Sequence, residues 1–343
     1  MTKVALIFLA LVSGLNGFSQ SHRDSLDNNE YIERYPNHFF IWPVLKQRKL
    51  RFDVKNIRSK ETIRFEPNNS YSLGFGAYVF DISFEVAFAI PVNEKSKKIY
   101  GESKARDLQI NTLSKKWGVD VYWQKYQGFY YDDGNFHMGD VPYPQRSDIT
   151  TRNFGLTGLY VFNDSKYSLR SAFNFSERQL KSGGSWIVSG TINSFKLNAD
   201  SAVIEASNRE DFGSGSAFKE LRYTTLSIAP GYAYNFIHKN FFASGALMLG
   251  PAHNWTYYKE EDKEERNDIR FNLYAGLRLG IGYNTDRFFG GVSLVTQSRA
   301  VRFEDLQVRN SSSTFRMMIG YRFREFGVLK KNVWDLPKEL SNL

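Results

Sequence analysis

The segment FNLYAGLRLGIGYN, residues 271–284, alternates apolar side chains with small or polar ones. Its apolar face carries Phe271, Leu273, Ala275, Leu277, Leu279, Ile281 and Tyr283. Successive side chains of a β-strand point to opposite faces, so this period of two predicts a strand with one apolar face. In a soluble protein that face would meet a hydrophobic core, whereas in a membrane barrel it would meet lipid. The segment alone leaves both alternatives open.

The same alternation recurs along most of the chain. In DISFEVAFAIP, residues 81–91, the apolar face carries Phe84 and its alternate neighbours. Further segments with this pattern are 115–126, 150–163, 166–178, 184–197, 219–236, 240–258, 287–303 and 314–325. Several are 14 to 19 residues long, whereas strands of globular proteins usually have roughly 3–10 residues. A tilted strand of ~9–11 residues crosses a bilayer and any remainder extends past the lipid, so these lengths favour a membrane barrel.

Aromatic residues are abundant, with 29 Phe and 20 Tyr, and several lie near the ends of the apolar faces. These are Trp117, Trp123, Tyr167, Trp186, Trp255, Tyr257, Tyr283 and Tyr321. Membrane barrels carry girdles of aromatic residues at both interfaces with water. We therefore expect Phe84 and the apolar residues in phase with it to face lipid.

The connections between the predicted strands alternate in length. Short turns are expected at 79–81, 115–116, 163–166, 237–240 and 284–287, and long polar loops at 91–105, 128–149, 208–218, 259–266 and 304–310. Short periplasmic turns and longer extracellular loops are typical of bacterial outer-membrane barrels. The alternation is maintained if 201–207 and a segment within 39–57 are also strands. The sequence thus predicts an all-β fold, a transmembrane antiparallel up-and-down β-barrel of about 14 strands, with about 12 as the alternative.

Residues 1–19 have the features of a cleaved secretory signal peptide. Lys3 precedes an apolar run at 4–12, and small residues stand before the expected cleavage site. A buried N-terminal helix or a membrane anchor is the alternative, although the run is shorter than the ~20 residues of a membrane-spanning helix. We predict a protein of the cell outer membrane with a signal peptide at 1–19, a periplasmic lead-in at 20–38, the barrel at 39–326 and a C-terminal tail at 327–343.

The composition excludes several other classes. The chain has no cysteine, so it has neither disulfides nor thiolate zinc sites. No apolar run after residue 19 reaches the length of a membrane-spanning helix. The net charge of +9 could suggest nucleic acid, but no basic recognition motif is present. A secreted soluble β-sandwich remains the alternative to the membrane barrel.

Four stretches, together with their spacing, resemble an uncharacterised outer-membrane β-barrel family of Bacteroidota, domain-of-unknown-function family 4421. They are FEPNNSYSLGFGA (65–77), KKWGVDVYWQKYQGFY (115–130), SAFNFSERQLKSGGSW (171–186) and APGYAYNF (229–236). The resemblance covers roughly residues 35–326 and implies a barrel in the outer membrane of a Gram-negative cell. No activity is assigned to the family, so the resemblance implies none and carries over no functional residue.

One long loop combines groups that bind metal ions in other proteins. It holds Asp132, Asp133, His137 and Asp140. Carboxylates are suitable ligands for a divalent cation. The spacing fits no established calcium loop, however, and YDDGN is also ordinary turn sequence, so a solvated acidic turn is the alternative. We predict no metal and no cofactor.

A lipid hydrolase would place a serine beside a histidine on the lipid-facing side, near the membrane boundary. His253 is the nearest candidate, in the outward phase close to Trp255. NFSERQLKSGGSW, residues 174–186, contains serines, but no histidine falls in a strand beside a serine of matching orientation. We interpret His253 as an interfacial residue and assign no catalytic residue.

Arginine is prominent on the second, non-apolar face of the predicted strands. The set is Arg170, Arg178, Arg270, Arg278, Arg299, Arg316 and Arg322. Glu85 and Asp120 are the clearest acids in the same phase. An electropositive lumen would attract anions. The alternative is that the arginines pair with these acids and fill a narrow barrel, since unpaired buried charges are costly.

The sequence therefore predicts a monomeric outer-membrane barrel that acts as a narrow passive pore or as a structural or interaction protein. Its expected partners are outer-membrane lipid and lipopolysaccharide, with small anions as candidates for the basic lumen and no nucleic acid. An outer-membrane lipid-modifying hydrolase or acyltransferase is the alternative, so the sequence leaves enzymatic activity open and favours a non-enzymatic role.

Overall fold

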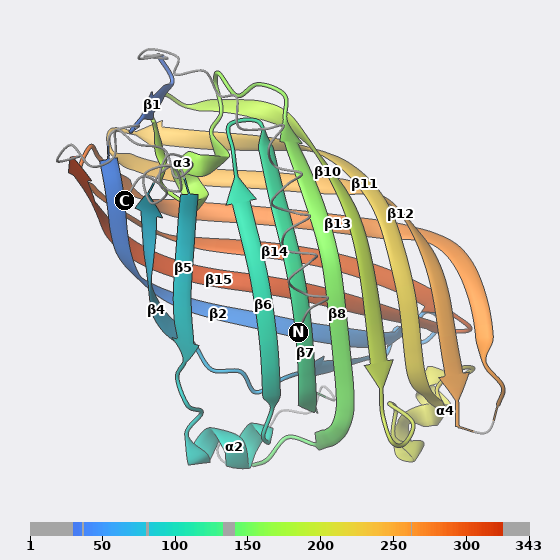
Figure 1. Cartoon of the computed structure of the whole chain (residues 1–343). Coiled ribbons are helices and arrows are strands. Elements are labelled where there is room, and N and C mark those ends of the chain that lie inside the picture. The colour runs from blue at the N-terminus through green and yellow to red at the C-terminus, as the bar shows by residue number, and fades with distance from the viewer. Residues whose placement is uncertain (1–29, 36–37, 80–81, 133–140, 262, 325–343) are drawn as a thin grey trace, which may run out of the picture.

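The computed structural model describes residues 30–35, 38–79, 82–132, 141–261 and 263–324. Its strands curve into one barrel-shaped sheet, with short helices at both ends (Figure 1). The predicted signal peptide at 1–19, most of the lead-in and the tail at 327–343 lie outside the described residues.

Ten antiparallel strands form a closed circuit. They are β2 (His38–Asn56), β3 (Thr62–Glu66), β7 (Trp117–Asp132), β8 (Gln145–Val161), β10 (Gly183–Asn198), β11 (Phe218–His238), β12 (Phe241–Glu260), β13 (Arg266–Asn284), β14 (Phe288–Phe303) and β15 (Leu306–Arg324). The circuit closes where β15 pairs with β2, from Leu306 opposite Asn56 to Arg324 opposite His38. This single closed sheet confirms the predicted antiparallel β-barrel, and the alternative of a two-sheet sandwich is wrong.

Three further strands attach to one side of the circuit. They are β4 (Ser72–Val79), β5 (Ile82–Ala89) and β6 (Lys104–Leu113). β2 pairs with β3 over residues 52–55 and with β4 over residues 40–46. β3 continues the circuit to β7, whereas β5 pairs with β4 and β6 pairs with β7. Within the described residues β5 and β6 form no ladder with each other, and their Cα atoms are more than 8 Å apart along nearly all of their length.

The predicted count of 14 strands is not confirmed. Ten strands close the circuit, and at the level of β4–β6 the wall contains twelve, namely β2, β4–β8 and β10–β15, with an unpaired seam between β5 and β6. The number therefore changes along the barrel, because β3 and β4 diverge toward different partners. A strand count from the sequence assumes one partner on each side of every strand and does not detect this divergence.

The two ends of the barrel differ as the sequence predicts. At the turn end, short connections at 114–116, 239–240 and 285–287 lie beside the start of β2 and the end of β15. At the loop end, the connections are longer and carry α2 (Glu94–Tyr100), η2 (Ala206–Asn208) and α4 (Arg209–Phe212). One expected loop, 304–310, is wrong: β14 ends at Phe303 and β15 begins at Leu306, with Glu304 at a positive φ of 46° in the tight turn.

The short turn expected at 163–166 and the strand expected at 166–178 are also wrong, because residues 162–182 form one long connection from β8 to β10 at the turn end. The segment 162–182, which we call the plug, contains α3 (Leu169–Phe173) and β9 (Glu177–Gln179), and β1 (Ile32–Arg34) pairs with β9. Four residues expected to face lipid are instead buried where the plug packs inside the turn end: Tyr167, Leu169, Phe173 and Phe175. A segment buried on all sides gives no periodicity that separates a short helix from a strand. Ser168 caps α3 by accepting a hydrogen bond from the Ser171 backbone N–H.

Two segments are expected to be strands only because they keep the loop lengths in alternation. The segment within 39–57 is β2, which confirms that prediction, whereas 201–207 forms no strand. Ala202, Val203 and Ile204 are buried beneath the loop end, and Val203 and Ile204 join the same hydrophobic cluster as Phe212 of α4. Their apolar run therefore reflects burial in a loop-end cap and not sheet pairing. The described part of the chain also has no helix long and apolar enough to cross a membrane.

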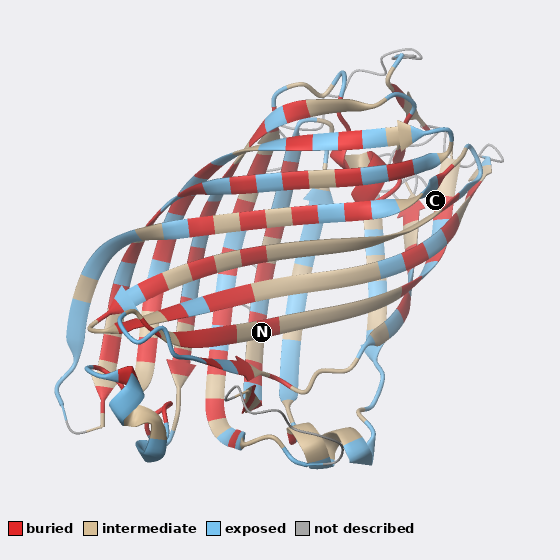
Figure 2. Cartoon of the chain, turned by 180° about the vertical axis from the view of Figure 1, so that it is seen from behind, coloured by how far each residue is buried: buried red, intermediate tan, exposed pale blue. Residues whose placement is uncertain are grey.

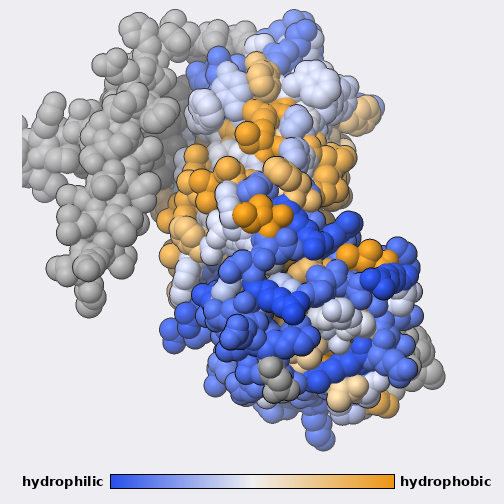
Figure 3. Space-filling view, turned by 90° about the vertical axis from the view of Figure 1, so that its right-hand side faces the viewer, coloured by the Kyte–Doolittle hydropathy of each residue, from blue (hydrophilic) through white to orange (hydrophobic). Residues whose placement is uncertain are grey.

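The face of the strands that carries the apolar residues changes along the barrel, from the outer face in the middle to the inner face at the loop end. In the middle of the barrel the exposed outward positions are apolar, for example Leu226, Ile228, Leu247, Leu249, Phe271, Leu279 and Ile281. At the loop end the apolar residues point inward and form a buried cluster that includes Phe52, Val54, Leu197, Leu221, Val301 and Val308. Figure 2 shows the alternation of buried and exposed positions along the strands, and Figure 3 shows a hydrophobic band above a hydrophilic half.

The aromatic residues expected in girdles mostly lie on the outward face. The exposed ones are Trp117, Trp123, Trp186, Trp255 and Tyr283. The prediction is wrong for Tyr167, which is buried in the plug. Near the turn end they form ring pairs across neighbouring strands: Trp117 with Tyr160, Trp186 with Tyr232, Phe241 with Tyr283, and Phe288 with Tyr321. Phe84, Val86 and Phe88 of β5 are also exposed, in phase with this apolar surface.

Candidate functional site

The arginines singled out in the sequence lie at different depths. Arg278, Arg299 and Arg322 are buried inside the barrel, and the side chains of Arg170, Arg178 and Arg316 are mostly buried. Arg270 is exposed instead, because it lies on the part of β13 that extends beyond the pairing with β14, which begins at Tyr274. Most of the set thus belongs to the interior, and its contacts decide what that interior can do.

Arg278 and Asp120 form a buried ion pair across the middle of the barrel. The Arg278 Nη2 donates to Asp120 Oδ2 at 2.5 Å, and the two side chains are only 8% and 4% exposed. Asn111 of β6 also donates to Asp120. The pair joins β13 to β7, and its burial leaves the guanidinium no free face for a solute.

A second charged cluster lies nearer the turn end and holds Glu85. Its carboxylate accepts hydrogen bonds from Arg316 and from the Trp42 indole, and it pairs with Lys46. Arg316 also donates to the Phe173 carbonyl at 2.6 Å, which links the wall to the plug. The predicted acids Glu85 and Asp120 are therefore both partners of predicted arginines.

Arg299 belongs to a hydrogen-bonded network of neutral groups. It donates to the Tyr122 hydroxyl at 2.7 Å and to Gln297 at 2.6 Å. Asn193 donates to the same hydroxyl at 3.1 Å and to Asn153 at 2.8 Å. The network ties β14, β7, β10 and β8 together through side chains that are almost completely inaccessible to solvent. Each strand contributes only one or two residues to this network, so the spacing of residues in the sequence does not reveal it.

Arg322 fixes the plug to the wall at the turn end. Its guanidinium donates to the Phe175 carbonyl at 2.6 Å, to Asn284 Oδ1 at 2.8 Å and to the Thr285 carbonyl. It also lies over aromatic rings, with centroid distances of 4.3 Å to Tyr35, 5.1 Å to Phe40 and 4.7 Å to Phe289. Within the described residues it has no carboxylate partner, so carbonyl oxygens and ring faces solvate its charge.

The plug has further polar anchors that the sequence did not reveal. Glu177 is buried and accepts from the Ser168 hydroxyl at 2.5 Å, and it pairs with Arg34 at 3.3 Å and with Arg170 at 3.6 Å. Asn235 of β11 donates to the Ser168 carbonyl at 3.0 Å. Arg178 lies at the rim, where it pairs with Glu33 and Asp286. Serine and asparagine carry no periodic signal, so these contacts follow only from the fold.

The loop end is closed by its own set of contacts. Arg146 donates to the carbonyls of Ala202 and Val203 at 2.8 and 2.9 Å. Glu261 accepts from the Ala202 backbone N–H at 2.8 Å and from Arg209 at 2.9 Å. The Ala202 N–H, more than the Arg209 guanidinium, holds the pKa of Glu261 below its usual range. Hydrogen bonds from Tyr258 and Arg266 likewise lower the pKa of Glu304 in the β14–β15 turn.

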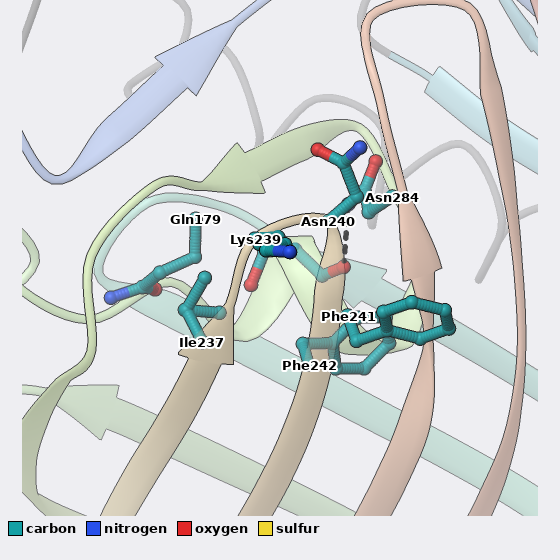
Figure 4. A pocket seen from close by; sticks show the side chains of 8 residues that line it. Gln179, Ile237, Lys239, Asn240, Phe241, Phe242 and Asn284 are labelled. Carbon is teal, nitrogen blue, oxygen red and sulfur yellow. Dashed lines mark hydrogen bonds between the residues drawn. The ribbon is translucent and has the colours of Figure 1, made fainter.

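Two cavities in the described part of the interior are the size of a water molecule. One lies where the plug meets the β11–β12 turn, between Gln179, Ile237 and Phe242, with a volume of about 10 Å³ (Figure 4). Another, also of about 10 Å³, lies in the middle beside Tyr274 and Arg278. A volume of this size holds about one water. Within the described residues, the plug occupies the turn end of the barrel, the central network its middle and the loop-end cap the opposite end.

The structure adds no support for a catalytic role of His253 or for a cation site in the loop that contains Asp132. His253 packs edge-on against Trp255 and Phe271, and its cross-strand neighbours, Leu226 and Phe271, carry no hydroxyl. Three residues of the proposed cation loop, Asp133, His137 and Asp140, lie outside the described residues. Among those that the structure describes, no group of three or more His, Asp or Glu is arranged to hold a metal ion.

These features define a closed antiparallel β-barrel with an apolar outer band and a packed interior. A family model matches residues 22–323, and the chain belongs to that family, described as a domain of unknown function (DUF4421). No curated protein matches the sequence.

Solved structures with some similarity are barrels of bacterial outer membranes. The outer-membrane protease OmpT from Escherichia coli is 8% identical, with a TM-score of 0.39, over 84% of this chain and 97% of that one. Ail, the attachment invasion locus protein of Yersinia pestis, is 16% identical, with a TM-score of 0.23, over 61% and 97%. A FadL homologue from Pseudomonas aeruginosa is 8% identical, with a TM-score of 0.22, over 84% and 90%. These scores are too low for any of the three to inform the function of this chain.

Proposed function

We propose that the protein spans the outer membrane of a Gram-negative cell as a monomeric, internally filled β-barrel. In this role it acts as a structural or interaction protein of the envelope and not as an open pore. One observation carries the proposal: in the middle of the barrel, the outward side chains are apolar and exposed, while the inward side chains at the same level are mostly polar. A water-soluble barrel would have the opposite arrangement, as the loop end of this molecule does.

In this account the interior arginines are internal cross-links. Arg278 and Arg316 pair with acids, and Arg299 and Arg322 are held by hydroxyl, amide and carbonyl oxygens. A lumen that conducted anions would present such groups to water, whereas these side chains are buried or mostly buried. The loop end then lies outside the cell and the turn end in the periplasm, as short periplasmic turns and longer outer loops are usual.

A charge placed in the apolar band tests membrane insertion directly. Leu279→Arg puts a guanidinium on the exposed outward face of β13, and we expect it to lower the free energy of unfolding in lipid vesicles by ~2–4 kcal/mol. Asn267→Arg, on the same face of the same strand but in its loop-end extension, should change it by no more than ~1 kcal/mol. The measurement is urea unfolding of the refolded chain in vesicles. Equal effects of the two substitutions would contradict the proposal.

A further inference from the structure

Five basic residues occupy directly opposed positions on five neighbouring strands. Arg106 of β6 lies opposite Lys125 of β7, and Lys125 lies opposite Arg152 of β8. Arg152 lies opposite Lys196 of β10, which in turn lies opposite Arg222 of β11. These strands are adjacent in the wall of the barrel (Figure 1). We call this set the basic row.

The basic row faces outward. Each of its members is exposed or half-buried, whereas the next residues along the strands, among them Gln124, Asn153, Phe195 and Tyr223, are buried inside. Adjacent strands are about 4.8 Å apart, so the row extends over roughly 19 Å of the outer surface. It is therefore a linear surface feature that runs across the strands.

The row is short of negative charge. Lys196 and Arg222 share Glu220, at 3.2 and 3.0 Å, and Arg222 reaches Glu265 at 4.0 Å. Arg106, Lys125 and Arg152 have no carboxylate within 4.0 Å among the residues that the structure describes. Like charges directly opposite each other destabilise a sheet. The two like-charged pairs that Lys125 forms with Arg106 and Arg152 are thus a cost that an external anion would remove.

The position of the row identifies the kind of anion. On the side toward the turn end, the next outward residues of β6, β7 and β8 are Leu108, Trp123 and Phe154, which are exposed and apolar. On the other side the next outward residues of β7 and β8 are Gln127 and Thr150, which are polar. On β10 and β11 the polar Ser194 and Thr224 come first, and the exposed apolar Ile192 and Leu226 lie one outward position further. The β6–β8 part of the row therefore lies directly at the edge of the apolar band, at the depth where the head groups of the adjacent leaflet would lie.

We propose that the basic row binds the phosphate groups of a membrane lipid in the leaflet at the loop end. Its length of roughly 19 Å suits a lipid that carries more than one phosphate, or two neighbouring lipids. Trp123 and Phe154 then contact the acyl chains beneath the bound head group. The inference rests on the proposed membrane insertion and adds a ligand site to it.

The test is binding of diphosphorylated lipid A by the full chain in detergent, measured by native mass spectrometry, with phosphatidylcholine as the comparison lipid. The variant is Lys125→Gln with Arg152→Gln, which removes two adjacent charges of the row. The matched control is Arg302→Gln with Arg309→Gln, two exposed arginines on the loop-end parts of β14 and β15. At roughly a fivefold loss for each charge, we expect the variant to bind lipid A ~30-fold more weakly and the control to bind within about twofold of the original chain.

The outcomes separate the alternatives. Equal losses in variant and control would overturn the site, since binding would then follow total charge alone. Competition by inorganic phosphate at concentrations like those of the lipid would assign the row to free phosphate and also overturn the lipid proposal. Lys125→Gln alone and Arg152→Gln alone provide the same comparison if the double variant fails to refold. A chain that inserts into vesicles and is sensitive to Leu279→Arg but binds no lipid A would refute the site and leave the proposed function intact.

Discussion

Replacing Arg278 with alanine is expected to lower the free energy of unfolding by about 3–5 kcal/mol. The substitution leaves the Asp120 carboxylate buried without its cation, and among the described residues only the Asn111 amide remains as a hydrogen-bond donor to it. Removing one partner of a buried ion pair costs far more than the pair itself contributes, because an uncompensated charge stays in a medium of low polarity. Urea unfolding of the barrel in vesicles or detergent measures the change.

Two comparisons make this expectation specific. Arg270→Ala removes an exposed arginine from the same strand, and we expect it to change the free energy of unfolding by no more than about 0.5 kcal/mol. Asp120→Ala should be costly alone, whereas Asp120→Ala combined with Arg278→Ala should cost about 1–3 kcal/mol less than the sum of the two. Additive effects would mean that the residues do not interact and that the interior is solvated.

Arg322→Ala is the second substitution with a large expected effect, about 3 kcal/mol. It removes the donor that holds the carbonyls of Phe175 and Thr285 and the amide oxygen of Asn284, and it leaves a cavity among aromatic rings. Because these acceptors connect plug and wall, hydrogen exchange should quicken within the plug more than in the central strands. Hydrogen-exchange mass spectrometry measures the local effect, and urea unfolding the global one.

Arg287→Ala is the matched control for Arg322. Arg287 lies in the β13–β14 turn, where its side chain is exposed. Its removal should change the free energy of unfolding by no more than about 0.5 kcal/mol. The rate of hydrogen exchange in the plug should stay the same. A plug that exchanges equally fast in the two variants would show that Arg322 does not fasten it.

The outer surface was the part most accessible to sequence reasoning. Alternation places Phe271, Leu279 and Phe84 on one face wherever a strand separates two environments, so the exposed band and the two unlike ends could be predicted. The pairing of Arg278 and Arg316 with Asp120 and Glu85 also followed as one of two alternatives, since these acids share the inward phase.

The contents of the barrel could not be predicted in the same way. Tyr167 and Phe175 alternate as strand residues do, but they are buried on every side in the plug, where periodicity carries no information. The cage around Arg322 joins residues from distant elements, and the hydrogen-bonded network of Tyr122 and Asn193 likewise depends on closure of the sheet. The register that aligns the basic row, too, follows only from the observed strand pairing.

The central claim is that the interior is filled, and conductance tests it most directly. The chain without residues 1–19 is refolded, its barrel is verified by a heat-dependent shift in gel mobility, and it is inserted into a planar bilayer. We expect folded barrels that insert and produce no conductance steps, because the plug, the central network and the loop-end cap occupy the described interior. Stable anion-selective steps that shrink on Arg278→Ala and Arg316→Ala would contradict the account and would make the interior a pore with a basic filter.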